Sequence, residues 1–250
     1  MDSQHRGFNI IEQEYNKTQA LPVAKTYMAN VFLWMTLALA VTAVTAYWFA
    51  STPELMGSLM NVTNGRYTGL SVLGWIVMLA PLGFVLLMSM GYQRLSPVIL
   101  TLLFIAFAIL MGMSLSFVLL AYTGASVFKT FAVTSAMFGV MAVLGYTTKT
   151  DLTKFGSILM MALFGMIIAM VINMFMHSSM MEYIISVAGV LIFTGLTAYD
   201  VQKLKRIGAG IGVDSQDANM RKMSIMGALT LYLDFINLFL FLLRFLGDRK

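Results

Sequence analysis

The stretch Phe193-Thr-Gly-Leu-Thr-Ala-Tyr-Asp-Val-Gln-Lys-Leu-Lys-Arg206 closes a long apolar run and carries a carboxylate, Asp200, inside its last turns. A second carboxylate, Asp234, lies within the next apolar run, in Leu231-Tyr-Leu-Asp-Phe-Ile-Asn237. Carboxylates at membrane depth are costly, and each is a functional-site hypothesis by default. Two of them on consecutive apolar runs are therefore the first candidates for a functional site.

Composition places the whole chain in the membrane class. The chain has 250 residues, of which 59% are hydrophobic and 11% are charged, whereas a soluble domain carries roughly 25% charged residues. The charges are confined to short gaps between apolar runs, and no polar stretch is long enough to fold into a soluble domain. The net charge of +5 is attributed to membrane topology, so a lipid environment is expected and a nucleic-acid partner is not.

Cysteine and histidine usage excludes several kinds of chemistry. The chain has no cysteine and only two histidines, His5 and His177. Disulfides, thiolate catalysis and metal sites built from cysteine or several histidines are therefore excluded.

Seven apolar runs reach the length of about 20 residues that a membrane span needs. Their expected ranges are 27–50, 71–90, 97–121, 126–145, 154–176, 181–201 and 223–246. The sequence thus predicts an all-α integral membrane protein. It would have an N-terminal tail over residues 1–26, a transmembrane domain over 27–247 and a short C-terminal tail over 248–250.

Local signals mark some of the helix boundaries. Ser96-Pro97 is a helix-start signal for the third run, with proline at the first helical position. Pro81 is expected to interrupt the second run. Thr148-Lys-Thr-Asp151 fits a capping box just before the fifth run.

The distribution of Lys and Arg predicts the orientation. If the N-terminus is cytosolic, the inner segments hold eleven of the 16 Lys and Arg residues and the outer segments hold five. Such an excess of cations inside favours a cytosolic N-terminus and, with seven spans, an external C-terminus.

Asp234 is the more demanding of the two carboxylates. It lies roughly 16 Å along the axis of its predicted helix, so it must be protonated, paired or exposed to a water-filled cavity. By the predicted boundaries Asp200 is nearer the cytosol by on the order of 10 Å. The two meet only if the sixth helix runs deeper, or if the seventh begins as a cytosolic extension. If they meet, they share a proton and titrate as a coupled pair.

The same pair, once deprotonated, is a hard oxygen site suited to Ca²⁺. Two further polar residues of the last run are secondary candidates. Asn237 lies three residues after Asp234 on the same helix face, and Arg244 lies near the outer end of that span.

Five stretches of this chain resemble the Bax inhibitor-1 family, also called the transmembrane Bax inhibitor motif family, in its bacterial branch. They are Met111-Gly-Met-Ser-Leu-Ser116, Thr134-Ser-Ala-Met-Phe-Gly139, Gly145-Tyr-Thr-Thr-Lys-Thr-Asp-Leu-Thr153, Phe193-Thr-Gly-Leu-Thr-Ala-Tyr-Asp-Val-Gln202 and Leu231-Tyr-Leu-Asp-Phe-Ile-Asn-Leu238. The resemblance covers most of residues 20 to 247. It implies a bacterial inner-membrane protein of seven helices, the last surrounded by the other six.

The resemblance also implies a function, a calcium leak regulated by pH. The sensing pair of the family falls on Asp200 and Asp234, and Ca²⁺ would be a transported or bound ion with no other cofactor. Some members latch the pair with an arginine of the second helix. The second apolar run here carries no charge, and Arg94 is only a nearby candidate.

Two other functions stay open. Other members of the family act by binding membrane proteins, including membrane proteases, without transporting ions. An intramembrane aspartyl protease would also place paired aspartates on consecutive helices, and Tyr199-Asp200 is similar to the first motif of those enzymes. However, Asp234 follows Leu231-Tyr-Leu where a Gly-x-Gly would be required, and no Pro-Ala-Leu follows later. The sequence therefore favours a protein that is not an enzyme.

Overall fold

A computed structural model describes residues 2–63, 66–211 and 217–250. Its elements are α1 (Asp2–Ser51), α2 (Pro53–Leu59), β1 (Met60–Thr63), β2 (Arg66–Leu70), α3 (Val72–Gly91), α4 (Pro97–Ala121), α5 (Gly124–Thr147), α6 (Thr153–Met176), α7 (Ser179–Ala209) and α8 (Asp217–Leu246). Within the described residues, seven helices are long and apolar enough to cross a membrane: Val23–Ser51 of α1, α3 to α7, and Ala218–Leu246 of α8. The chain is an all-α multi-pass membrane protein.

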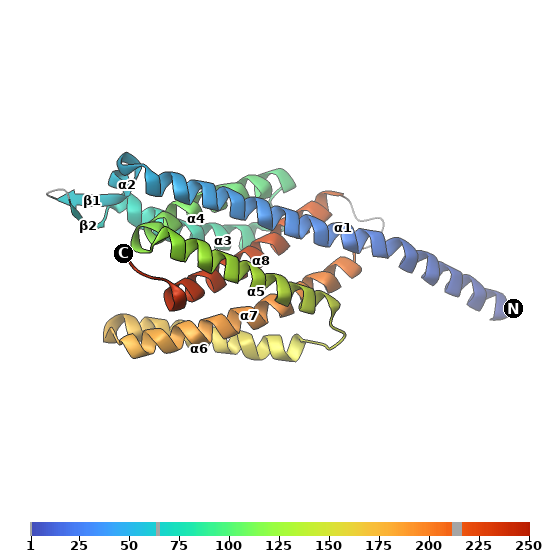
Figure 1. The fold of residues 1–250 in the computed structure, drawn as a ribbon. Coiled ribbons are helices and arrows are strands. Elements are labelled where there is room, and N and C mark those ends of the chain that lie inside the picture. Colours follow the sequence, from blue (N-terminus) through green and yellow to red (C-terminus); the bar gives the residue numbers. More distant parts are fainter. Residues whose placement is uncertain (1, 64–65, 212–216) are drawn as a thin grey trace.

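The bundle has two ends, which are named here by the chain termini. The N-terminal end, on the right in Figure 1, carries the α3–α4 and α5–α6 connections, the end of α7 and the start of α8. The C-terminal end, on the left, carries α2, the β1–β2 hairpin, the α4–α5 and α6–α7 connections, and residues 247–250. The hairpin is antiparallel, with a register shift between Asn61 and Val62.

Helix starts follow the local chemistry in part. The Ser96 hydroxyl accepts a hydrogen bond from the Ile99 N–H at 3.3 Å, and Pro97 begins α4, as predicted. The predicted interruption at Pro81 is absent, because α3 continues through this buried proline. Helices in membranes tolerate proline where neighbouring groups satisfy the freed carbonyl.

The predicted capping box before α6 is wrong. The residue that caps α6 is Leu152, whose side chain has no capping bond. The Thr148 hydroxyl accepts from the Thr150 N–H at 3.3 Å instead. Asp151 satisfies a backbone group at the start of α6, since its Oδ1 accepts a hydrogen bond from the Thr153 N–H at 2.9 Å.

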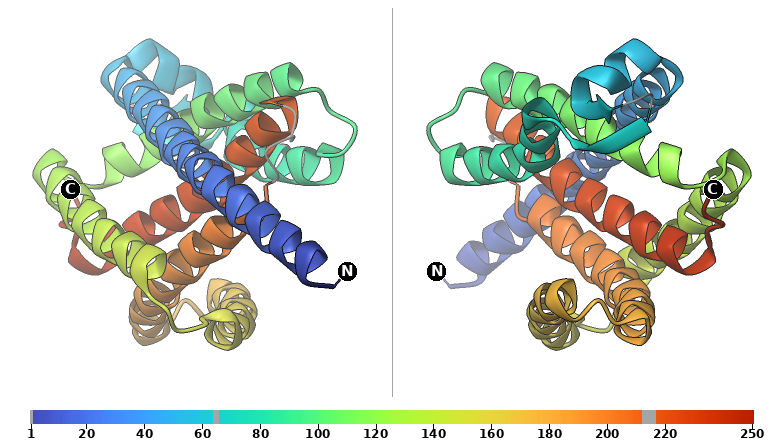
Figure 2. Two further views of the ribbon diagram at one scale, coloured as in Figure 1. Left: turned by 90° about the vertical axis from the view of Figure 1, so that its right-hand side faces the viewer. Right: turned by 90° about the vertical axis from the view of Figure 1, so that its left-hand side faces the viewer.

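Helix α8 is the most buried of the seven spans. In the most apolar part of α8, 72% of the residues are buried, whereas in the most apolar part of α6 only 11% are buried. Helices α1, α4, α5 and α7 pack against α8, while α3 packs on α4 and α6 packs on α7. Figure 2 shows α8 (red) passing through the inside of the bundle and α6 (yellow) on its outside. A complete ring of six helices around α8, as the family resemblance implies, stays a prediction.

The last residues of the chain are tied to the α4–α5 connection. The Thr123 N–H donates to the Asp248 carbonyl at 3.1 Å, and the Lys250 N–H donates to the Ala121 carbonyl at 3.0 Å. The Ser126 hydroxyl donates to Asp248 Oδ2 at 3.1 Å. These bonds fix the position of residues 248–250 at the C-terminal end of the bundle.

Candidate functional site

The structure brings the two candidate carboxyl groups together. The side chains of Asp200 of α7 and Asp234 of α8 lie next to each other, within hydrogen-bonding reach, and they are 9% and 5% exposed. Asp234 Oδ2 is buried and has no hydrogen-bond partner among the described residues. Ionised carboxylates only accept hydrogen bonds, so a proton between the two groups is needed to supply a donor.

The two carboxyls meet because both helices extend past their apolar runs. Helix α7 continues to Ala209 and α8 begins at Asp217, whereas the apolar runs predicted an end near Val201 and a start near Met223. The extension of α7 places Asp200 nine residues before its end, or about 14 Å inside the helix. The depth mismatch expected from the sequence is thereby removed.

A cavity of about 370 Å³ reaches Asp200 from the N-terminal end of the bundle. It lies between α1, α3, α7 and α8 and is lined by Tyr27, Ser89, Tyr92, Asp200, Lys203, Leu204, Ile207, Met223, Met226, Gly227 and Thr230. Lys203 is the charged group that interacts electrostatically with Asp200 there. Asp234 does not line the cavity. Asp200 can therefore be reached from the cavity, whereas Asp234 cannot be reached from it directly.

Two glycines allow α5 and α6 to approach the turn of α7 that precedes Asp200. A Cβ on Gly145 of α5 would overlap the Ala198 carbonyl, and a Cβ on Gly156 of α6 would overlap the Tyr199 ring. Close backbone approach through small residues is a common way to pack membrane helices. The segment that carries Asp200 is thus held from two sides.

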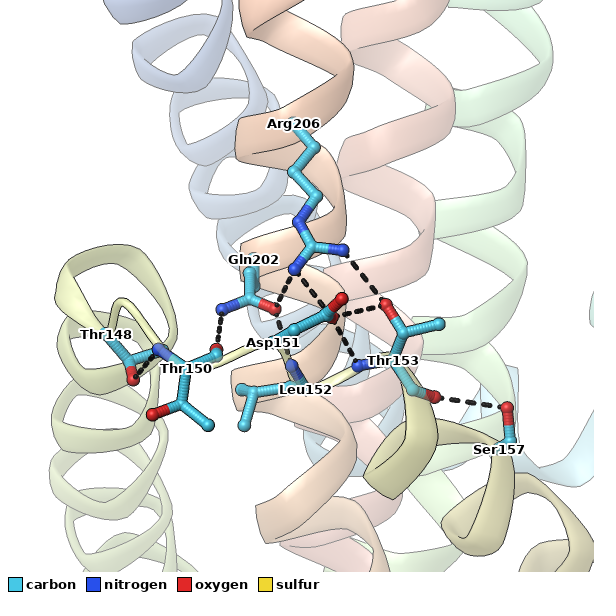
Figure 3. Close-up of polar contacts among 8 residues, drawn as sticks. All are labelled: Thr148, Thr150, Asp151, Leu152, Thr153, Ser157, Gln202 and Arg206. Carbon is cyan, nitrogen blue, oxygen red and sulfur yellow. Dashed lines mark hydrogen bonds and ion pairs between the residues drawn. The ribbon is translucent and has the colours of Figure 1, made fainter.

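Gln202 ties the next turn of α7 to the α5–α6 connection (Figure 3). Its Oε1 accepts from the Leu152 N–H at 2.9 Å, and its Nε2 donates to the Thr150 carbonyl at 2.8 Å. Arg206 Nη2 also donates to Oε1 at 2.9 Å. The Gln202 side chain is buried, and we call these three hydrogen bonds the Gln202 clamp.

An exposed ion pair extends the Gln202 clamp to the surface (Figure 3). Arg206 Nη2 lies 2.7 Å from Asp151 Oδ1, and Arg206 Nη1 donates to the Thr153 hydroxyl at 2.9 Å. Hydrogen bonds from the hydroxyl and the backbone N–H of Thr153, and then from Arg206, hold the pKa of Asp151 below its ordinary value. Asp151 thus remains ionised under acidic conditions that protonate an ordinary aspartate.

Tyr232 anchors the middle of α8 two residues before Asp234. The Thr42 hydroxyl of α1 donates to the Ala108 carbonyl of α4 at 2.9 Å. The single proton of Thr42 is then used, so the Tyr232 hydroxyl is the donor in its 2.8 Å contact with Thr42 Oγ1. This network joins α1, α4 and α8 at the depth of the acid pair.

The secondary candidates lie away from the pair. The Asn237 amide donates to the Leu233 carbonyl of its own helix at 2.9 Å. Arg94 is exposed, does not line the cavity, and its side chain has no ion pair within the described part of the chain. Arg244 lies at the C-terminal end of the bundle, 3.8 Å from Glu182, which also pairs with Arg249 at 3.2 Å.

The sequence did not single out Gln202 and Tyr232 as parts of this site. Both lie inside the stretches that carry the two aspartates, and the signal that could have identified them is a polar side chain close to a buried carboxylate.

Of the described residues, no three His, Cys, Asp or Glu side chains lie close enough together to hold a metal ion. Asp200 and Asp234 contribute two carboxyl groups to the bundle interior, and both are buried.

Fold and site together define a multi-pass membrane protein with an acid pair buried between its last two helices. Residues 24–250 match the family model described as "Inhibitor of apoptosis-promoting Bax1". The chain belongs to the Bax inhibitor-1 family.

Several bacterial proteins are similar over nearly the whole chain. The Escherichia coli "Inner membrane protein YbhL" is 45% identical over 227 residues, which cover 90% of this chain and 93% of that protein. A protein of Rickettsia prowazekii is 43% identical over 226 residues, covering 90% and 91% of the two chains. A protein of Borreliella burgdorferi is 40% identical over 232 residues, covering 93% and 96%.

Proposed function

We propose that this protein is a pH-sensitive calcium leak channel of the bacterial inner membrane, with Asp200 and Asp234 as its sensor. The observation that carries the proposal is the close approach of the two buried carboxyl groups, together with the lack of any hydrogen-bond donor to Asp234 Oδ2 among the described residues. Two like charges so close in a buried setting cannot both ionise cheaply, so the pair shares one proton. A shared proton makes the contact sensitive to pH.

The shared proton joins α7 to α8 and favours a closed state. Raising the pH removes this proton, and the two carboxylates then repel each other or accept a cation. Acid has the opposite effect, because protons and metal ions compete for the same oxygens. The leak should therefore increase as the pH rises.

The site favours passage of Ca²⁺ over its storage. Calcium takes six to eight oxygen ligands, and two carboxylates supply four at most. The cavity of about 370 Å³ gives a hydrated ion access to Asp200 from the N-terminal end. A site with few protein ligands holds the ion weakly and lets it leave.

The orientation proposed is the one that the distribution of Lys and Arg predicts, with the N-terminus in the cytosol and the C-terminus outside. The cavity would then open to the cytosol. Reporter fusions after Lys250 and within the 203–222 region should report opposite sides of the membrane. Reporters on the same side would contradict the seven-span topology.

We further propose that the acid pair does not catalyse a reaction. An aspartyl protease needs both carboxyls next to the scissile bond, and only Asp200 lines the cavity. Close packing of Gly145 and Gly156 against α7 leaves no space for a peptide strand on the opposite side of that helix. Both observations favour a proton- and cation-responsive pair.

Calcium flux into proteoliposomes tests the proposed function. Vesicles that contain the purified chain and a trapped calcium dye should show a leak that increases as the pH is raised from about 5 to about 8, because the pair loses its shared proton. Protein-free vesicles are the control. No flux at any pH, together with a membrane protein that co-purifies stably with the chain, would contradict the channel and favour a regulator that binds membrane proteins.

A further inference from the structure

A second, larger cavity lies at the opposite end of the bundle from the one that reaches Asp200. Its volume is about 540 Å³. Helices α1 and α5 barely touch each other, although both pack against α8, and the cavity is the groove that this gap leaves. It is lined by residues 39–51 of α1, 115–120 of α4, 124–131 of α5 and 235–239 of α8, and by Lys250. We call it the α1–α5 groove.

The length of the α1–α5 groove matches one leaflet of a bilayer. Along α1 it runs from Leu39 to Ser51, twelve residues or about 18 Å of helix axis. The hydrocarbon core of a bilayer is about 30 Å thick, so the groove extends from one membrane surface to about the midplane. An acyl chain that enters from the C-terminal end has the matching length.

The interior of the groove suits a hydrocarbon chain. Phe235, Ile236 and Phe239 of α8 form its floor. The one polar group at its inner end, the Thr42 hydroxyl, already bonds to the Ala108 carbonyl and the Tyr232 hydroxyl. A ligand there meets no polar group that needs a further partner.

A cation lies at the mouth of the groove. Lys250 Nζ donates to the Leu119 carbonyl at 3.1 Å and has no carboxylate partner among the described residues. Its neighbours are already engaged, since Asp248 bonds to Ser126 and Arg249 pairs with Glu182. The Lys250 ammonium is thus free to pair with an anion at the membrane surface, where phospholipids carry their phosphates.

We propose that the α1–α5 groove binds one acyl chain of a phospholipid from the leaflet at the C-terminal end, with the lipid phosphate on Lys250. The site is separate from the acid pair, and its occupancy can be measured without any flux assay.

Native mass spectrometry of the purified full-length chain with added phosphatidylglycerol tests this assignment. Ala43 is exposed and lines the groove, so Ala43→Trp fills the groove from its open side without entering the core. Ala40 is also exposed on α1 but does not line the groove, and Ala40→Trp is the matched control. Wild type and Ala40→Trp should retain one phosphatidylglycerol, and Ala43→Trp should bind it about tenfold more weakly.

A second variant tests the headgroup. Lys250→Gln should weaken phosphatidylglycerol binding several-fold while leaving the binding of monoacylglycerol, an uncharged lipid with one chain, unchanged. Equal affinity in all variants, or equal loss in Ala40→Trp and Ala43→Trp, would overturn the proposal. It would also be overturned by a dimer that Ala43→Trp abolishes, because the groove would then be occupied by a second copy of the chain.

Discussion

The Gln202 clamp can be tested by Gln202→Met, which keeps the length of the side chain and removes its hydrogen bonds. The change breaks the bonds to the Leu152 N–H and the Thr150 carbonyl, at 2.9 and 2.8 Å. A typical hydrogen bond contributes about 1 kcal/mol to stability after exchange with water. Arg206 keeps its pairing with Asp151, so we expect a total loss of about 2 kcal/mol.

The expected loss is large enough to measure in detergent. For a chain of this size, 1 kcal/mol corresponds to about 2–4 °C, so the midpoint of thermal unfolding should fall by about 4–8 °C. The assay is size-exclusion chromatography of the heated protein, scored by the surviving monodisperse peak. Gln93 is an exposed glutamine in the α3–α4 connection, and Gln93→Met is the matched control.

Two results would refute this reasoning. A Gln202→Met protein that melts within about 1 °C of wild type would show that the clamp contributes no net stability. A Gln93→Met protein that falls as far as Gln202→Met would show that replacing any glutamine with methionine has this effect.

Tyr232→Phe should cost about 1 kcal/mol, seen as a fall of about 2–4 °C in the same melting assay, because Thr42 loses one of its two partners. Tyr47→Phe, at an exposed position on α1, should melt as wild type does; equal falls in both would contradict the buried bond. Asp151 has a pKa below its ordinary value, so its ionised form stabilises the fold at pH values above the unfolded pKa. Asp151→Asn should thus lower the melting temperature at neutral pH, and the gap to wild type should close on acidification through the folded pKa. Two melting curves a constant distance apart across the acid range would contradict this account.

The membrane spans could be predicted because apolar length alone specifies them. All seven predicted runs coincide with helices, since backbone groups in lipid must be satisfied within each helix. Their ends were less predictable. The apolar criterion ended the sixth run near Val201, but Lys203, Lys205 and Arg206 continue α7 as a charged helix. Such residues extend their long side chains to the membrane surface, so a helix can continue for several residues beyond the end of its apolar run.

The contact between Asp200 and Asp234 was predicted only conditionally, because a sequence gives no relative helix depth. The cost of an isolated carboxylate at the position of Asp234 favoured a partner, and the extended helices supply it. Arg94 illustrates the opposite case. Its nearness in sequence to the second span suggested a latch, but it lies exposed beyond the end of α3.

Features that depend on packing between distant helices left no readable signal. The α1–α5 groove exists because α1 and α5 each pack on α8 but barely touch each other, and no local pattern encodes that gap. Gln202 likewise bonds to a connection some fifty residues earlier in the chain. A single polar residue in a helix does not reveal such a distant partner.

Calcium flux in proteoliposomes as a function of pH, compared for wild type, Asp200→Asn and Asp234→Asn, is the most direct test of the central claim. Asparagine keeps the shape of each side chain and removes its titration, while Asp151→Asn controls for the loss of a carboxylate outside the membrane. We predict that flux through wild type and Asp151→Asn increases as the pH rises. Both variants of the pair should carry flux that no longer responds to pH. A wild-type pH profile in Asp200→Asn and in Asp234→Asn would show that the two aspartates are not the sensor.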